Sequence, residues 1–151
     1  MGEPLRSRHM FGMIIKLALI LTLGGSILFF LLGLLSQKGK SKGLVNGRLA
    51  ECPASPNAVS SEPGTQPEKY VEPLQAKLED VLQAIKDTGG VITSHSDKYL
   101  SATYMSAVFK FVDDVEVRAD GALCHIRSAS RVGYSDRGAN RKRVAAIRAA
   151  L

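Results

Sequence analysis

The sequence predicts an α+β fold in which a small antiparallel sheet has two helices packed on it and is preceded by one transmembrane helix. Three observations support this prediction: a long uncharged apolar segment near the N-terminus, a helix–strands–helix order in the remainder, and an Asp-Gly pair between two alternating segments. Residues 51–151 remain for a single α+β domain, which is enough chain for one hydrophobic core.

The apolar segment over residues 17–35 (LALILTLGGSILFFLLGLL) contains no charged side chain. At a rise of about 1.5 Å per residue it covers about 28 Å, close to the hydrocarbon thickness of a bilayer. Lys16 stands at its start, where the ammonium can reach lipid headgroups. A cleaved signal peptide is the alternative, but its apolar region is usually about 7–15 residues long. We therefore expect a tail over residues 1–10 and an uncleaved membrane span over residues 11–35.

One side of this span carries small side chains, a pattern that lets a second helix approach closely. The candidate contact residues are Ala18, Thr22, Gly25 and Ser26. They make a membrane-protein complex a candidate partner, in addition to the membrane itself.

The net charge of +6 arises from residues 1–50, because residues 51–151 carry equal numbers of acidic and basic side chains. Residues 36–50 are rich in Gly, Lys and Ser, and they are predicted to be a basic, flexible linker near anionic headgroups. A neutral domain does not predict nucleic-acid binding. The two flanks of the span carry similar numbers of Lys and Arg, so the charge pattern leaves its orientation open.

The domain begins with a proline-rich segment over residues 52–68 that is predicted to be a loop. A first amphipathic helix is predicted from Pro73 to the glycines at 89–90. A C-terminal helix should follow the N-cap candidates Ser135 and Asp136. Its buried stripe is predicted to contain Val144, Ile147 and Leu151.

Stretches rich in aromatic and β-branched residues predict strands over residues 91–96, 99–106 and 109–112. A β-hairpin should follow them, since residues 114–127 alternate in character on both sides of an Asp-Gly pair.

This hairpin is predicted to turn at residues 120–121 (Asp-Gly). Glu116 would then lie opposite His125 on the outer face of the ribbon. Asp114 would lie opposite Arg127 on the same face. The core face would hold Val115, Val117, Cys124 and Ile126.

Two segments, CPASPNAVSS at residues 52–61 and RSASRVGYSDRGANRKR at residues 127–143, resemble the family known as domain of unknown function 1499. The segment FVDDVEVR at residues 111–118 fits the same pattern. The resemblance implies a protein of bacterial envelopes or of the plant thylakoid lumen. It also implies a cytoplasmic N-terminus and a periplasmic or lumenal domain, and it implies no agreed activity.

One departure from the family pattern concerns cysteine. The family often reads CPxSPNCVSS, whereas this chain has Ala58 at the position of the second cysteine, so a disulfide inside this loop is excluded. A bridge between Cys52 and Cys124 and a free, buried Cys124 both stay open.

Within the domain, residues 51–120 carry a net charge of −6 and residues 121–151 a net charge of +6. One interpretation is that arginines of the second part pair with acids of the first part inside the fold. The residues concerned are Arg127, Arg131, Arg137, Arg141, Asp113, Asp114 and Glu116.

The other interpretation is a small anion-binding module, because guanidinium groups, hydroxyls and a helix start together suit carboxylate or phosphate groups. Its candidate residues are Arg127, Ser128, Ser130, Arg131, Tyr134, Arg137, Asn140 and Arg141.

A hydrolase is a third interpretation. Its nucleophile would be Ser130 or Ser135, and its base would be His125. Asp136 or Glu116 would orient the base, but no GxSxG motif fixes these residues together. With two cysteines and three histidines that do not cluster, no metal site or cofactor is expected. We therefore expect a membrane-tethered, non-catalytic accessory or scaffolding domain, with the anion-binding module as the alternative.

Overall fold

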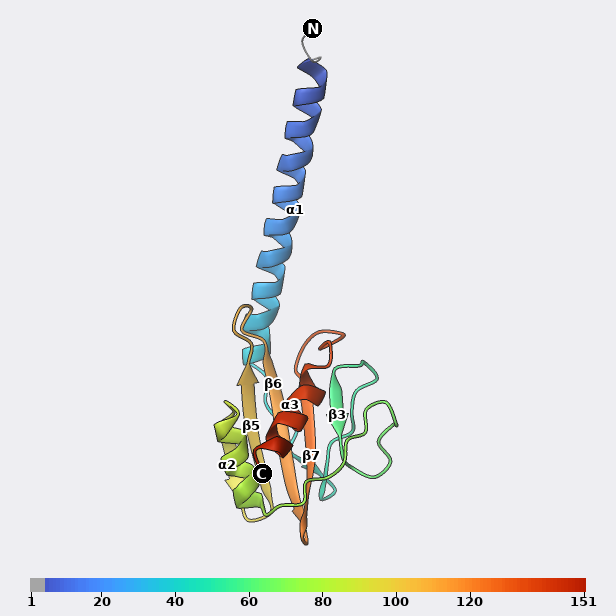
Figure 1. The fold of residues 1–151 in the computed structure, drawn as a ribbon, viewed down its shortest axis with the longest axis vertical. Coiled ribbons are helices and arrows are strands. Elements are labelled where there is room, and N and C mark those ends of the chain that lie inside the picture. Colours follow the sequence, from blue (N-terminus) through green and yellow to red (C-terminus); the bar gives the residue numbers. More distant parts are fainter. Residues whose placement is uncertain (1–4) are drawn as a thin grey trace.

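The computed structural model describes residues 5–151 and shows an α+β domain from which one long helix, α1 (Leu5–Gln37), projects (Figure 1). In chain order the other elements are β1 (Leu44–Val45), β2 (Arg48–Leu49), β3 (Ala58–Ser60), α2 (Leu78–Asp87), β4 (Val91–Ser96), β5 (Tyr99–Met105), β6 (Val112–Asp120), β7 (Leu123–Ser130) and α3 (Ala139–Ala149). The predicted α+β class is confirmed, and β1 and β2 add a separate two-stranded sheet.

The helix α1 is longer than the predicted span over residues 11–35, because it begins within the predicted tail and continues to Gln37. Residues 1–4 of that tail lie outside the described part of the chain. The stretch His9–Gln37 is long and apolar enough to cross a membrane, and very little of it is buried against the domain. The Thr22 hydroxyl donates to the Ala18 carbonyl at 3.0 Å, so it does not need water as a partner.

The five-stranded sheet has the order β3-β7-β6-β5-β4, and each neighbouring pair is antiparallel. The helices α2 and α3 pack on one face of this sheet (Figure 1), and apolar side chains from alternate strand positions meet them there. The fully buried core residues include Leu74, Val81, Ile85, Leu100, Val115, Val117, Ile126 and Ile147.

The hairpin between β6 and β7 turns at residues 121–122, one position later than predicted. Gly121 has a φ of +62° and Ala122 is not among the residues with positive φ, which suits a turn that needs positive φ at its first position only. Glu116 therefore pairs with Arg127, and not with His125. A shift of two residues leaves every side chain on its predicted face, so the predicted core face is confirmed.

The helix α2 begins at Leu78, five residues after the predicted start at Pro73. The helix starts later because the chain around Leu74 pairs with the part of β7 that β3 leaves without a neighbour. The Leu74 amide donates to the Cys124 carbonyl, and the Cys124 amide donates to the Leu74 carbonyl, each at 2.9 Å. These bonds hold the chain before α2 extended, because the edge of β7 beyond β3 needs partners for its backbone groups.

The predicted N-cap candidate Asp136 does serve the start of α3, since its carboxylate accepts from the amides of Gly138 at 2.9 Å and Asn140 at 2.7 Å. The helix itself begins only at Ala139, because Arg137 and Gly138 have positive φ values of 53° and 80°. Leu151 was wrongly placed on the buried stripe, because the helix ends two residues before it and its side chain is 48% exposed.

Three segments differ from their predicted conformations. The proline-rich segment over residues 52–68 contains β3, which pairs with β7. The segment over residues 36–50, which we expected to be flexible, contains the β1–β2 hairpin and packs on the domain through Leu49 and Ala50. The segment over residues 106–111 is a loop, because β6 starts only at Val112.

Candidate functional site

The face of the sheet opposite α2 and α3 carries charged side chains that are buried in ion pairs. Arg127 Nη1 lies 2.9 Å from Glu116 Oε2, and both side chains are almost fully buried. Arg131 makes a two-pronged contact with Asp114, with Nε–Oδ2 at 2.8 Å and Nη2–Oδ1 at 2.7 Å. The interpretation that these arginines pair with acids inside the fold is therefore confirmed for two of them.

Glu116 is the centre of this face. Besides Arg127, it accepts hydrogen bonds from the Tyr99 hydroxyl at 2.8 Å and from the Gly43 amide at 2.7 Å. Burial and the hydrogen bond to Glu116 raise the pKa of Tyr99 to about 12. Both carboxylate oxygens of Glu116 thus accept hydrogen bonds. The bond from Gly43 fixes the segment after α1 on the sheet, and Glu116 does not orient His125.

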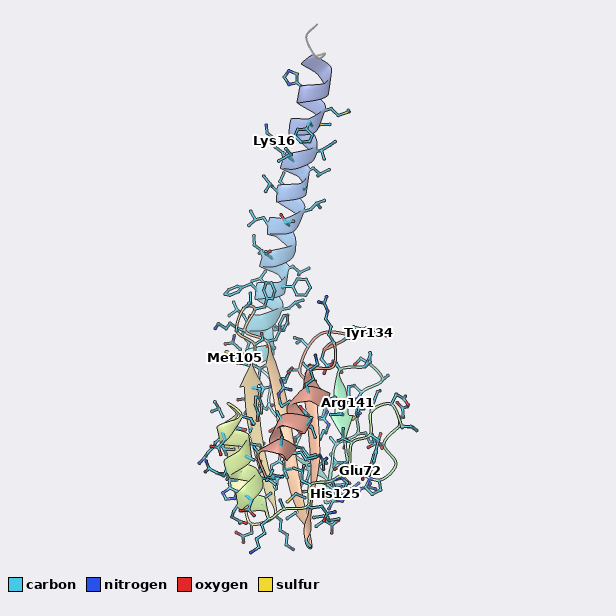
Figure 2. The ribbon with its side chains drawn as sticks, viewed as in Figure 1. Lys16, Glu72, Met105, His125, Tyr134 and Arg141 are labelled. Carbon is cyan, nitrogen blue, oxygen red and sulfur yellow. The ribbon has the colours of Figure 1, made fainter. Side chains whose placement is uncertain are left out.

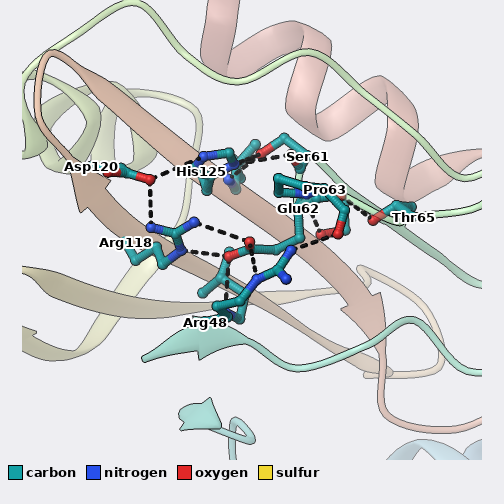
Figure 3. Close-up of polar contacts among 11 residues, drawn as sticks. Arg48, Ser61, Glu62, Pro63, Thr65, Arg118, Asp120 and His125 are labelled. Carbon is teal, nitrogen blue, oxygen red and sulfur yellow. Dashed lines mark hydrogen bonds and ion pairs between the residues drawn. The ribbon is translucent and has the colours of Figure 1, made fainter. Parts of the chain in front are cut away.

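A second ionic cluster surrounds Glu62 (Figure 3). Its carboxylate accepts from Arg118 Nε at 2.5 Å and Nη2 at 3.0 Å, and from Arg48 Nε at 3.1 Å. The Leu49 amide donates to it at 2.9 Å. Burial alone would raise the pKa of Glu62, but the hydrogen bonds from Arg118, Leu49 and Arg48 outweigh burial and lower this pKa to about 2.

His125 lies beside Ser61 and Asp120, which resembles the order of a catalytic triad (Figure 3). Its Nδ1 is 2.9 Å from the Ser61 carbonyl oxygen and 3.3 Å from the Ser61 hydroxyl. A carbonyl oxygen only accepts, so Nδ1 carries the proton and cannot take one from Ser61. Ser61 is also a buried residue, and its hydroxyl accepts from the Ile126 amide at 2.8 Å. The arrangement therefore holds the chain in place and lacks an activated nucleophile.

The structure does not bring the predicted hydrolase residues together. Ser130 accepts from Asn140 Nδ2 at 3.1 Å, Ser135 accepts from the Arg137 amide at 3.3 Å, and Asp136 caps α3. Each of these side chains serves the local structure around α3.

The eight predicted anion-binding residues lie on different sides of the domain. Arg127 and Arg131 belong to the charged face, whereas Ser128 and Asn140 are buried between β7 and α3. Three more of these residues lie beyond β7 and are exposed or bound elsewhere. Tyr134 is 78% exposed, Arg137 is exposed and has a positive φ, and Arg141 donates to the carbonyls of Glu68 and Tyr70. Ser130 lies next to Asn140.

Sequence reasoning missed Arg143, which completes the polar cluster under α3. Its Nη2 lies 2.7 Å from Asp113 Oδ2, and its Nη1 donates to Asn140 Oδ1 at 2.6 Å. The guanidinium also lies 4.6 Å from the centre of the Tyr104 ring. The signal was present in the sequence, because residue 143 follows Asn140 by three and lies on the same helix side as Ile147.

Part of the predicted anion-binding set lines a cavity of about 400 Å³ beside the segment that follows α1. Its lining residues include Lys40, Lys42, Arg127, Ser130 and Arg131. Arg127 Nε is buried and has no hydrogen-bond partner among the residues that the structure describes. Such a donor is unusual in a folded protein. The cavity therefore combines four basic side chains with the carboxylate of Asp114.

A second cavity, of about 510 Å³, lies between the β1–β2 hairpin and residues 60–69. Lys69 lines this cavity, and its Nζ donates to the carbonyls of Pro53 and Ala54. Cys52 also lines this cavity; burial raises the pKa of its thiol although Arg127, Lys69 and Lys42 oppose this. Both cysteines are free in the structure, and burial raises the pKa of Cys124 to about 11. The thiols are therefore protonated at neutral pH.

The end of the sheet that meets α1 forms a junction with it through aromatic contacts and hydrogen bonds. The ring centroids of Phe29 and Phe109 lie 5.4 Å apart. Phe111 packs edge-on against Phe29, with 6.3 Å between the ring centroids. The Val112 amide donates to the Ser36 hydroxyl at 3.0 Å, and Arg131 Nη1 donates to the Ser36 carbonyl at 3.1 Å. Met105 and Tyr134 lie at this end of the domain, whereas His125 lies at the other (Figure 2).

Within residues 5–151, no group of three or more His, Cys, Asp or Glu side chains could hold a metal ion. Comparison with known proteins gave no match among curated proteins and none among solved structures. The family model described as protein of unknown function (DUF1499) matches residues 48–151, which is more than half of the chain and covers the charged face, the polar cluster under α3 and most of both cavities. The chain therefore belongs to the DUF1499 family of proteins of unknown function.

Proposed function

We propose that this protein is a membrane-tethered, non-catalytic domain of a bacterial envelope or a lumen that serves as an accessory or scaffolding element for a partner in or at the membrane. The observation that carries this proposal is the junction between α1 and the sheet. An apolar helix of spanning length enters the domain without a break, and its last turn bonds to Val112 and Arg131. A partner that holds α1 would therefore also fix the position of the domain.

The helix offers a surface for such a partner. A side chain at Gly25 would meet nothing within 4 Å in this chain. Gly25 lies on the same side of the helix as Ala18 and Thr22, so a second helix can approach closely there. Gly24 is equally open but points about 100° away around the helix, and it provides a matched control position.

The test is co-purification from membranes in a mild detergent. The triple variant Ala18→Leu, Thr22→Leu, Gly25→Leu should lose a protein that co-purifies with the wild type, because larger side chains separate the two helices. The Gly24→Leu variant should keep that protein. Equal co-purification with both variants would contradict a role for this side of α1, and a wild type that purifies alone would contradict scaffolding through the membrane helix.

The anion-binding module remains a second candidate. It is favoured by Arg127, which lines the cavity of about 400 Å³ and whose Nε has no hydrogen-bond partner within residues 5–151. Arg127 and Arg131 already pair with acids, so the additional positive charge comes from Lys40 and Lys42, both exposed. Inorganic phosphate should raise the melting temperature of the full chain if it binds there. The Lys40→Gln, Lys42→Gln variant should lose this gain, whereas Lys98→Gln, at the far end of the sheet, should keep it. No gain with the wild type would refute this candidate.

A further inference from the structure

We propose that the loop over residues 106–111, together with Met105, enters the bilayer beside α1 and forms a second membrane contact of the domain. We call residues 105–111 the β5–β6 loop. This proposal rests on α1 as a membrane span, as in the proposed function, and adds a lipid-facing surface in the family domain itself.

The β5–β6 loop exposes apolar side chains, with Ser106 and Lys110 exposed beside them. Val108 is 72% exposed and Met105 is 57% exposed, and neither has a role in the core of the domain. Phe109 and Phe111 are half-buried because they pack on Phe29 of α1. Apolar side chains that project together at the membrane end of a domain gain stability when lipid covers them.

The depth of the loop follows from its contact with α1. Phe29 precedes the last apolar residue of the span, Leu35, by six residues, which is about 9 Å of helical rise. Phe109 packs on Phe29, so it lies at about the same depth below the surface formed by Ser36 and the lysines that follow. If the bilayer surface lay on the N-terminal side of Phe29 instead, the exposed apolar side chains of the last turns of α1 would face water. These are Phe29, Phe30, Leu31, Leu34 and Leu35.

The polar groups at the neck of the loop have partners that suit such a position. The Ser106 amide donates to the Phe111 carbonyl at 2.8 Å, and the Phe111 amide donates to the Ser106 hydroxyl at 2.9 Å. Gln37 Nε2 reaches the Lys110 carbonyl at 3.4 Å. Lys110 is the loop's charged residue, and its long side chain can extend to the headgroups. The backbone at the neck of the loop is thus satisfied without water.

The chain contains no tryptophan, so a single introduced tryptophan reports its own surroundings. We would place one at Val108 in the loop, one at Leu23 in α1 and one at Lys98. Lys98 precedes β5 at its other end. The rise of an extended strand over seven residues places it about 23 Å from Met105. Each full-length variant is reconstituted in phosphatidylcholine–phosphatidylglycerol vesicles with and without lipids brominated on their acyl chains, which quench fluorescence on contact.

The Val108→Trp variant should lose emission to the brominated lipids to an extent close to that of Leu23→Trp, and its spectrum should shift to shorter wavelength. Lys98→Trp should show neither effect. Quenching of Leu23→Trp with none for Val108→Trp would overturn the loop proposal and leave the anchor intact. No quenching of Leu23→Trp would overturn both. Adding Gly33→Leu, which pushes the loop off α1, should reduce the quenching of Val108→Trp and leave that of Leu23→Trp unchanged.

Discussion

The carbonyl oxygen of Phe109 occupies the space that a side chain at Gly33 would need. A Cβ atom at this helix position would overlap that oxygen, so the backbone of the β5–β6 loop rests directly on the backbone of α1. Gly33 is thus required by a close approach between two segments far apart in the sequence, whereas Gly24 and Gly25 have open space around them. This contact, with the bonds to Ser36, makes α1 part of the domain.

Replacing Gly33 with Leu should weaken this junction. Overpacking of this kind costs about 1–3 kcal/mol, and it should lower the melting temperature of the full chain in detergent. It should also speed cleavage by a lysine-specific protease at Lys110. Gly24→Leu is the matched control, because nothing lies within 4 Å of its side-chain position. Equal stability and equal cleavage of the two variants would show that the loop does not rest on α1.

The pair of Arg127 and Glu116 should be more sensitive to the loss of one partner than to the loss of both. Glu116→Leu leaves the Arg127 guanidinium buried and unpaired, which costs on the order of 3–5 kcal/mol. The double variant Glu116→Leu, Arg127→Met should recover part of this loss. Urea unfolding of the four members of the cycle measures the coupling. Additive effects of the two single changes would contradict a direct pair.

Stability should fall in acid through Glu62. Its pKa is about 2 in the folded chain and 4.5 in the reference state, so the unfolded state binds the proton first as the pH falls. The stabilisation from Glu62 is therefore fully present above about pH 4.5 and is lost progressively toward pH 2. Glu62→Gln should be less stable than the wild type by about 1–3 kcal/mol at neutral pH, and the difference should shrink between these pH values. A constant difference would contradict the assignment.

The two cysteines should react as protonated, shielded thiols. Cys52 is half-buried and Cys124 is buried with its thiol 3.3 Å from the Ala76 carbonyl. Iodoacetamide at neutral pH should therefore modify Cys52 slowly and Cys124 only after unfolding, as mass spectrometry of peptides would show. If neither reacts in denaturant until a reductant is added, the two residues form a bridge.

The sequence predicted the faces of the strands better than their register. The side chains of Val115 and Ile126 alternate with charged neighbours, and this period of two survives the two-residue shift of the hairpin. The shift itself depends on which residue takes positive φ, and both Asp-Gly and Gly-Ala can turn at this point. The partner of Glu116 therefore became clear only with the structure.

Elements held by distant contacts were the ones that sequence patterns missed. The β1–β2 hairpin has strands of two residues and is bonded through Leu49 to Glu62, a partner that composition does not reveal. Strand β3 stands between prolines and was predicted as loop. The arginines at 127 and 131 were foreseen as either internal ion-pair partners or anion ligands, and only the sheet topology placed Asp114 and Glu116 against them.

Alkaline carbonate extraction of membranes, followed by mass determination of the retained chain, tests the central claim most directly. The account predicts that the full-length chain stays in the membrane pellet with residues 11–35 present. Release into the supernatant, or a mature chain that lacks the first thirty-five residues, would contradict the membrane tether and with it the role of the α1 junction.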